Sequence, residues 1–175
     1  MGDDLAVDDP RDELTGVLGY SALATLRPES QMVLVDLLHF RDRFNYPYGH
    51  GAGDRVLKEA GTRLRDGLAP LRVFRSGGDE FIVEAGADLD GAGAVALANR
   101  IAGLLALPIE GLGQPLAPHA GLPAIPSGAF GQPLEARIGV VLGPVGEDWH
   151  HAKMIAERAA DDAGRQGLLV VIATP

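Results

Sequence analysis

The stretch Phe74-Arg75-Ser76-Gly77-Gly78-Asp79-Glu80-Phe81 lies near the middle of the chain and organises the interpretation of the rest. Apolar residues flank it on both sides, as in two strands joined by a turn. Gly77 and Gly78 supply the positive φ angles that a two-residue β-hairpin needs. Because consecutive strand residues point to opposite faces, Asp79 and Glu80 serve one point only if the backbone twists there. The alternative is ordinary turn chemistry, with Glu80 solvated at a sheet edge.

Composition limits the classes of protein that this chain can represent. Its 175 residues, 46% hydrophobic and 22% charged, are typical of one soluble globular domain. The net charge of -9 weakens any case for binding nucleic acid through its phosphates, whereas a small anionic ligand stays compatible if a metal and local donors reverse the field. The absence of cysteine excludes disulfides and thiol catalysis. Without a secretion signal or a long apolar run, we expect a cytoplasmic protein with no membrane segment.

The apolar run Met32–Leu38 predicts a strand that is buried on both faces, in the middle of a sheet. Asp36 interrupts this run. An ionised carboxylate there is costly unless a cation or several donors meet it, and ligand crevices of open α/β sheets lie at the carboxyl ends of strands. The alternative is that Asp36 caps the next helix.

Helical periodicity is clear in 51–68, where apolar residues recur on one side and basic residues on the other. Asp54 falls in the first turn of this expected helix and is favourable there through the helix dipole alone. Further on we expect a helix over Ala94–Leu107, a strand over Ala136–Leu142, a helix leading to Gly164 and a strand over Leu168–Ala173. The Gly- and Pro-rich stretch 111–134 predicts an inserted loop or long irregular hairpin without chemistry of its own. The alternative is a partner-binding or lid element.

Several motifs in order carry a family resemblance: Asp12-Glu13-Leu14-Thr15-Gly16, Asp36 to Arg41, Tyr48-Gly49-His50-Gly51-Ala52-Gly53-Asp54 and Gly77-Gly78-Asp79-Glu80-Phe81. With these, the chain resembles the GGDEF domains, the diguanylate cyclases. The resemblance is specific from Asp12 to Phe81 and loose in the C-terminal half. The order of elements fits an α+β fold with a ferredoxin-like β-α-β-β-α-β core, as in nucleotide cyclases and the polymerase palm, with extra helices and the Gly/Pro-rich insertion. We expect a flexible segment over 1–11 and a single domain over 12–175.

The resemblance implies that two GTP molecules condense to cyclic di-GMP, each held by one chain of a homodimer. Spacing and resemblance together favour Asp36 as a ligand of Mg²⁺ or Mn²⁺. The resemblance adds Asp79 and the Leu37 carbonyl as metal ligands, and Glu80 as a further catalytic acid near the attacking hydroxyl or the metal. We expect the catalytic residues to be Asp36, Asp79 and Glu80.

The substrate-binding residues are likewise implied by the resemblance. In the family, main-chain N–H groups and a basic side chain hold the triphosphate at the positions of Phe40 and Arg41. Gly77 and Gly78 belong to the same substrate site. Asn45 and Asp54 would contact guanine. Asp54 therefore has two interpretations: it stabilises the helix through the dipole, or it contacts the guanine base. Because the span from Asp36 to Gly49 is one residue longer than usual, Asn45 reaches the base only if the extra residue lies before it.

This chain departs from the family pattern at several positions. Leu38 replaces a second Asp, Gly164 a phosphate-binding Lys and Leu168 a phosphate-binding Arg. Arg165 or Lys153 could compensate. Leu68 and Leu71 replace the Arg and Asp of the product-binding inhibitory site. Two alternatives follow. One is a catalytically weak or inactive module that binds a nucleotide or a regulatory partner protein. The other is a cyclase with altered nucleotide choice.

Overall fold

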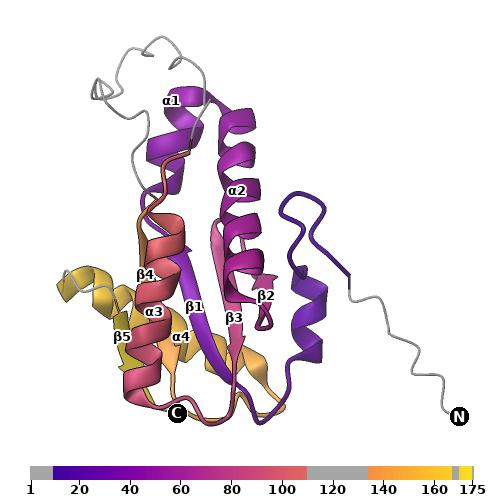
Figure 1. The fold of residues 1–175 in the computed structure, drawn as a ribbon, viewed down its shortest axis with the longest axis vertical. Coiled ribbons are helices and arrows are strands. Elements are labelled where there is room, and N and C mark those ends of the chain that lie inside the picture. The colour runs from indigo at the N-terminus through magenta and orange to yellow at the C-terminus, as the bar shows by residue number, and fades with distance from the viewer. Residues whose placement is uncertain (1–9, 110–133, 167–169, 175) are drawn as a thin grey trace, which may run out of the picture.

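The computed structural model describes residues 10–109, 134–166 and 170–174. Figure 1 shows the arrangement of its helices and strands. In order, these are the 3-10 helix η1 (Tyr20–Thr25), β1 (Gln31–Leu37), the π-helix η2 (Arg41–Asn45), α1 (Tyr46–Tyr48), α2 (His50–Leu68), β2 (Arg72–Arg75), β3 (Glu80–Ala85), α3 (Gly91–Leu105), β4 (Ala136–Val141), α4 (Trp149–Gln166) and β5 (Val170–Ala173). The expected insertion over 111–134 lies outside the described residues except for Leu134, and so does most of the segment 1–11.

A single five-stranded sheet, ordered β2-β3-β1-β4-β5, forms the centre of the fold. β1 pairs antiparallel with β3 on one side and β4 on the other, and β5 runs parallel to β4. The connectivity β1-α2-β2-β3-α3-β4 confirms the ferredoxin-like β-α-β-β-α-β core. The apolar run in β1 explains its central place, because a strand with two neighbours and both faces covered must be apolar throughout.

Helices α2 and α3 cover one face of the sheet, and α4 covers the other (Figure 1). The periodic apolar side of α2 packs on the first face. Its buried contributors are Val56, Leu57, Ala60, Leu64 and Leu68. On the second face, Met32, Leu34 and Ile82 of the sheet meet Ala152, Ala156 and Ala160 of α4. Small side chains bring α4 close to the sheet, so residues near one end of β1 and β4 lie within reach of side chains from α4.

Several boundaries differ from those that the sequence predicts. β1 ends at Leu37, so Leu38 follows the strand. α2 begins at His50, which leaves no acidic residue in its first turn. The helix-dipole interpretation of Asp54 is therefore wrong. Pro47 lies within α1, at a first-turn position where proline is tolerated.

Two other helices also differ from their expected limits. α3 begins at Gly91 because the Asp90 side chain accepts a hydrogen bond from the Gly93 N–H at 2.7 Å and caps it, and it ends at Leu105. α4 continues through Gly164 as far as Gln166. Among the described residues, every helix is too short or too polar to span a lipid bilayer.

Glu84 is a fully buried carboxylate on the α4 side of β3. It accepts hydrogen bonds from the Arg27 N–H at 2.8 Å, from Arg27 Nε at 3.2 Å and from Arg72 Nη1 at 3.2 Å. Burial raises the pKa of this carboxyl, but these donors outweigh burial and the net pKa is lowered. The charge thereby ties the segment before β1 to the edge of the sheet.

We predict that Gly139→Ala destabilises the fold while Gly103→Ala does not. A Cβ at Gly139 would lie 1.9 Å from the Ala156 carbonyl oxygen and 2.8 Å from the Ala160 nitrogen, so α4 would have to move off β4. Such overpacking costs about 1–3 kcal/mol. A Cβ at the exposed, helical Gly103 meets nothing within 4 Å and should stabilise by about 0.4–1 kcal/mol. Urea denaturation measures both, and equal midpoints for the two variants would contradict this packing.

Candidate active site

Three charged residues share one rung of the sheet. Asp36 on β1 lies opposite Glu80 on β3 and opposite Arg137 on β4. Because directly opposed residues of neighbouring strands point to the same face, these three side chains gather on the α4 side. The rung therefore places an acid between another acid and a base at the end of the central strand.

Asp36 is the central member of this rung, with 14% of its side chain exposed. Its Oδ2 accepts a hydrogen bond from Arg137 Nε at 2.6 Å. Burial is the largest influence on the pKa of Asp36 and raises it; Arg137 opposes this effect, and the charges of Asp79 and Glu80 raise the pKa further. The three acids are therefore electrostatically coupled, and their mutual repulsion favours a bound cation.

Lys153 of α4 pairs with the second acid of the rung. Its Nζ lies 3.0 Å from Glu80 Oε2 and also contacts Glu157. Burial lowers the pKa of Lys153, but the hydrogen bonds that it donates to Glu157 and Glu80 outweigh burial, so the net pKa is raised. Lys153 thus stays charged and faces the candidate site, whereas Arg165, the other base expected to compensate, pairs with Asp162 on the exposed end of α4.

Asp79 lies in the turn between β2 and β3, beside the end of β1. The Leu37 N–H donates to the Asp79 carbonyl at 3.1 Å, and the Ser76 N–H donates to the Glu80 carbonyl at 3.0 Å. β2 and β3 pair antiparallel, which confirms the predicted hairpin, but its turn contains three residues, 77–79, and not two. Gly77 and Gly78 are also absent from the described glycines with positive φ. A Cβ at Gly77 would lie 2.8 Å from Glu80 Oε2, so a larger residue there would displace the end of the Glu80 side chain.

Arg75 fixes the shape of this turn. Its Nε donates to the Gly77 carbonyl at 3.1 Å and its Nη2 to the Gly78 carbonyl at 2.8 Å, while Nη1 reaches both carboxylate oxygens of Asp12. Asp12 also accepts hydrogen bonds from the N–H and hydroxyl of Thr15. Burial raises the pKa of Asp12, but Thr15 and Arg75 outweigh burial and the net pKa is lowered. The N-terminal motif therefore holds the hairpin turn through one guanidinium.

The segment after β1 turns sharply into a π-helix. His39 adopts φ 54°, a left-handed conformation that is uncommon for a residue other than glycine. Phe40 follows, buried and packed on Phe44 with ring centroids 5.6 Å apart, while Arg41 is exposed at the start of η2. A π-helix accommodates one more residue than an α-helical turn, which gives the extra residue of this span a place at 41–45.

Asn45 ends the π-helix and lies against the start of α2. A Cβ at Gly53 would be 1.8 Å from Asn45 Oδ1, so only glycine permits this approach. Asp54 follows Gly53 directly and is exposed. The structure thus brings Asn45 close to the helical turn that carries Asp54, on a different element from the carboxylate rung.

Sequence reasoning missed Arg137 and Arg75 as members of the site. Arg137 also pairs with Asp161 of α4 through Nη1, at 2.6 Å. Gly164, the expected replacement for a phosphate-binding lysine, lies against Arg137: a Cβ there would be 3.6 Å from Arg137 Cδ. The one available signal is a charged residue within the apolar strand 136–142. Leu168 lies outside the described residues.

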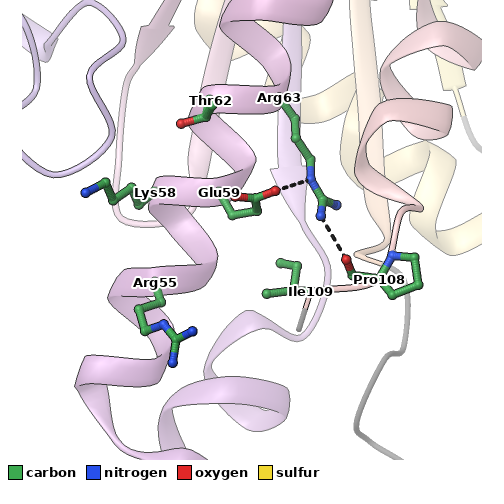
Figure 2. A pocket seen from close by; sticks show the side chains of 7 residues that line it. All are labelled: Arg55, Lys58, Glu59, Thr62, Arg63, Pro108 and Ile109. Carbon is green, nitrogen blue, oxygen red and sulfur yellow. Dashed lines mark hydrogen bonds and ion pairs between the residues drawn. The ribbon is translucent and has the colours of Figure 1, made fainter. Parts of the chain in front are cut away.

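A pocket of about 520 Å³ lies between α2 and the segment that follows α3 (Figure 2). It is lined by Arg55, Lys58, Glu59, Thr62, Arg63, Pro108 and Ile109. Arg63 binds Glu59 at 2.8 Å and the Pro108 carbonyl at 2.9 Å, so its charge is already engaged within the fold. The pocket belongs to the α2 side of the sheet and is separate from the rung of Asp36.

Fold and site together define the class of protein. The five-stranded sheet with helices on both faces and an acid at the end of its central strand is the architecture of the nucleotide cyclases and of the polymerase palm. The family model described as diguanylate cyclase, GGDEF domain, matches residues 20–118, more than half of the chain. This chain belongs to the GGDEF domain family.

Similar proteins agree with this assignment. An uncharacterized signaling protein from Caulobacter vibrioides is 40% identical over an alignment of 120 residues, which covers 61% of this chain and 15% of that protein. Diguanylate cyclase DgcS from Shewanella oneidensis is 38% identical over 63 residues, 35% of this chain and 21% of that protein. The solved structure of a sensory box/GGDEF family protein from Caulobacter crescentus matches with a TM-score of 0.69 and 31% identity, covering 90% of this chain and 99% of that one. The chain spans less than a quarter of either curated relative.

We predict that Arg75→Lys weakens the fold because lysine cannot serve Asp12 and both turn carbonyls at once. Losing charge-assisted hydrogen bonds from a side chain that is 16% exposed should lower the free energy of unfolding by about 1–3 kcal/mol. The matched control is Arg165→Lys, at a side chain that is 69% exposed, and it should stay within about 0.5 kcal/mol. Chemical denaturation measures both. If the two variants were equally stable, Arg75 would not be holding the turn.

Proposed function

We propose that this chain is a diguanylate cyclase domain that condenses two GTP molecules into cyclic di-GMP. Family membership and the carboxylate rung of Asp36 and Glu80 beside Asp79 support this proposal. The observation that carries it is the coupling of Asp36 with Asp79 and Glu80, because a scaffold has no need for mutually repelling acids at one end of its sheet. We further propose that residues 12–175 form the domain.

The donor set fits Mg²⁺. Asp36, Asp79 and the Leu37 carbonyl offer hard oxygen ligands, and the repulsion among the acids favours a cation. Among the described residues, no three acidic or histidine side chains stand close enough to hold a metal without other ligands. Mg²⁺ usually takes one or two carboxylates and completes its shell with water and substrate phosphates, so the proposal needs no third acid. Mn²⁺ suits the same ligands.

The residues after β1 would bind the nucleotide. The main chain at Phe40 and the exposed Arg41 lie directly beyond the Asp36 strand end and would receive the phosphates, with Gly77 and Gly78 in the facing turn. Asn45 and Asp54 offer an amide and a carboxylate, which match the donors and acceptors on the edge of guanine. The π-helix supports this assignment because it accommodates the extra residue within 41–45, before α2 begins.

In the proposed reaction the 3′-hydroxyl oxygen of one GTP forms a bond to the α-phosphorus of the other, the bond to pyrophosphate breaks, and the hydroxyl proton leaves to a base. The same step repeated in the opposite sense closes the ring. The bound divalent ion would lower the pKa of the attacking hydroxyl and neutralise the leaving group. Asp36 and Asp79 would hold the divalent ion, and Glu80 lies beside them. Much of the rate enhancement would therefore come from the positioning of the reacting groups. Since each domain would hold one GTP, turnover requires two chains.

A catalytically weak module that acts as a regulator is the second candidate. Its support is that basic side chains already neutralise two acids of the site, Asp36 through Arg137 and Glu80 through Lys153. Such a module would bind a nucleotide or a partner protein without turnover. A third candidate is a cyclase with another base preference, because the π-helix reshapes the segment that ends at Asn45.

We predict that Asp79→Ala abolishes turnover and leaves the fold intact. The assay incubates purified protein with Mg²⁺ and each nucleoside triphosphate in turn, and measures pyrophosphate and cyclic product. Removing a metal-binding carboxylate should lower the rate by about 100-fold or more, whereas Asp66→Asn, at an exposed residue of α2, should leave it unchanged. Turnover by Asp79→Ala equal to that of the parent would place the active site elsewhere. A wild-type dimer without turnover on any nucleotide would favour the regulator.

A further inference from the structure

Arg137 is the base that contacts the central acid of the site. It comes from β4, where its neighbours on the strand are apolar, and its side chain is 33% exposed. Nε binds Asp36 and Nη1 binds Asp161, each at 2.6 Å. A guanidinium has five N–H donors, and Nη2 has no partner among the described residues. Arg137 therefore has hydrogen-bond donors available beside Asp36 while its charge neutralises that carboxylate.

We propose that Arg137 binds the triphosphate of the substrate. In the substrate-free protein, the ion pair with Asp36 holds this guanidinium in place. The proposal rests on the proposed function, since it requires a nucleotide at the end of β1. On binding, Arg137 exchanges the Asp36 oxygen for a phosphate oxygen, and Asp36 becomes available as a metal ligand.

Charge makes this exchange favourable. A divalent ion engaged by Asp36 would repel the guanidinium, whose next available strong anion is the triphosphate carried by the same ion. The planar fork of Arg matches phosphate oxygens and binds them with paired hydrogen bonds. Asp161, which is 48% exposed, is a more solvated partner and holds Arg137 less tightly than a phosphate does.

The packing of α4 leaves room for this side chain. Gly164 lies beneath it, with an added Cβ at 3.6 Å from Arg137 Cδ and 3.8 Å from Nη1. A long side chain at position 164 would compete with Arg137 for the same space. The strand thus supplies a cation at a place where the helix has none.

The other bases close to the acids are less suited to this role. Lys153 is 16% exposed and contacts two carboxylates, Glu80 and Glu157, so its transfer would leave both without a counter-ion. Arg165 pairs with Asp162, and neither appears among the charges that act on Asp36. Arg137 has both the proximity and the unused donors.

The test compares ligand binding by wild type, Arg137→Gln and Arg165→Gln. The probe is a GTP analogue with a methylene group between the α- and β-phosphorus atoms, which cannot release pyrophosphate, measured by calorimetry in Mg²⁺ beside GMP. Arg137→Gln should bind the analogue about 10- to 100-fold more weakly, because it loses a charge-assisted hydrogen bond. Its affinity for GMP should change by less than about threefold, and Arg165→Gln should match wild type for both ligands.

A second measurement uses Mn²⁺ alone, without nucleotide. Because Arg137 competes for Asp36, Arg137→Gln should bind Mn²⁺ about threefold more tightly or better. Opposite changes in affinity for Mn²⁺ and for the triphosphate are the signature of exchange, and a merely structural arginine would not produce them.

Each outcome decides the proposal. If wild type binds the analogue and Arg137→Gln binds it equally well, Arg137 only pins β4 to β1 and the proposal is overturned, while the cyclase function stands. If wild type binds no triphosphate in Mg²⁺, the proposed function itself fails. Should Arg137→Gln not fold, Arg137→Lys replaces it, since lysine keeps the charge and loses the fork. It should retain part of the affinity, and full affinity would overturn the proposal.

Discussion

A carboxylate on the central strand is the constraint on which the rest of this structure depends. Asp36 lies near the carboxyl end of a largely apolar strand, between Glu80 and Arg137 on the two neighbouring strands. Burial alone would favour the neutral acid, so the fold must bring a cation to it. Arg137 from β4 supplies that cation, and Lys153 from α4 does the same for Glu80. The acids at this end of the sheet are thereby neutralised without a ligand, and they can also bind a ligand that carries its own cation.

The packing of α4 makes this arrangement possible. Alanines face the sheet along the helix, and Gly139 of β4 has no side chain, so helix and strand approach closely. Charged side chains of α4 then reach the charged residues at the end of the sheet. Asp161 pairs with Arg137 and Glu157 pairs with Lys153, so each of these two cations contacts one acid of α4 as well as one acid of the sheet. The small residues of α4 and β4 thus permit both the close packing of the helix on the sheet and the ion pairs between helix and sheet.

Much of the fold follows from the sequence, because patterns along the chain carry it. The apolar run identified the central strand, and the helical spacing identified α2. The turn type was wrong because hydrogen bonds from Arg75, and not glycine dihedral angles, shape that turn. Arg137 was missed because its partner Asp36 is 101 residues away, and only strand pairing reveals that the two are neighbours.

The carboxylates of the site and Asn45 lie on different elements, the sheet and the π-helix. The acids at 36 and 80 are fixed by backbone pairing on the central strands, whereas Asn45 ends a short π-helix and lies against Gly53 of α2. Under the proposed function, the residue that contacts the base and the residues that hold the metal therefore belong to separate elements of the molecule, one a helical segment and the other the paired strands of the sheet.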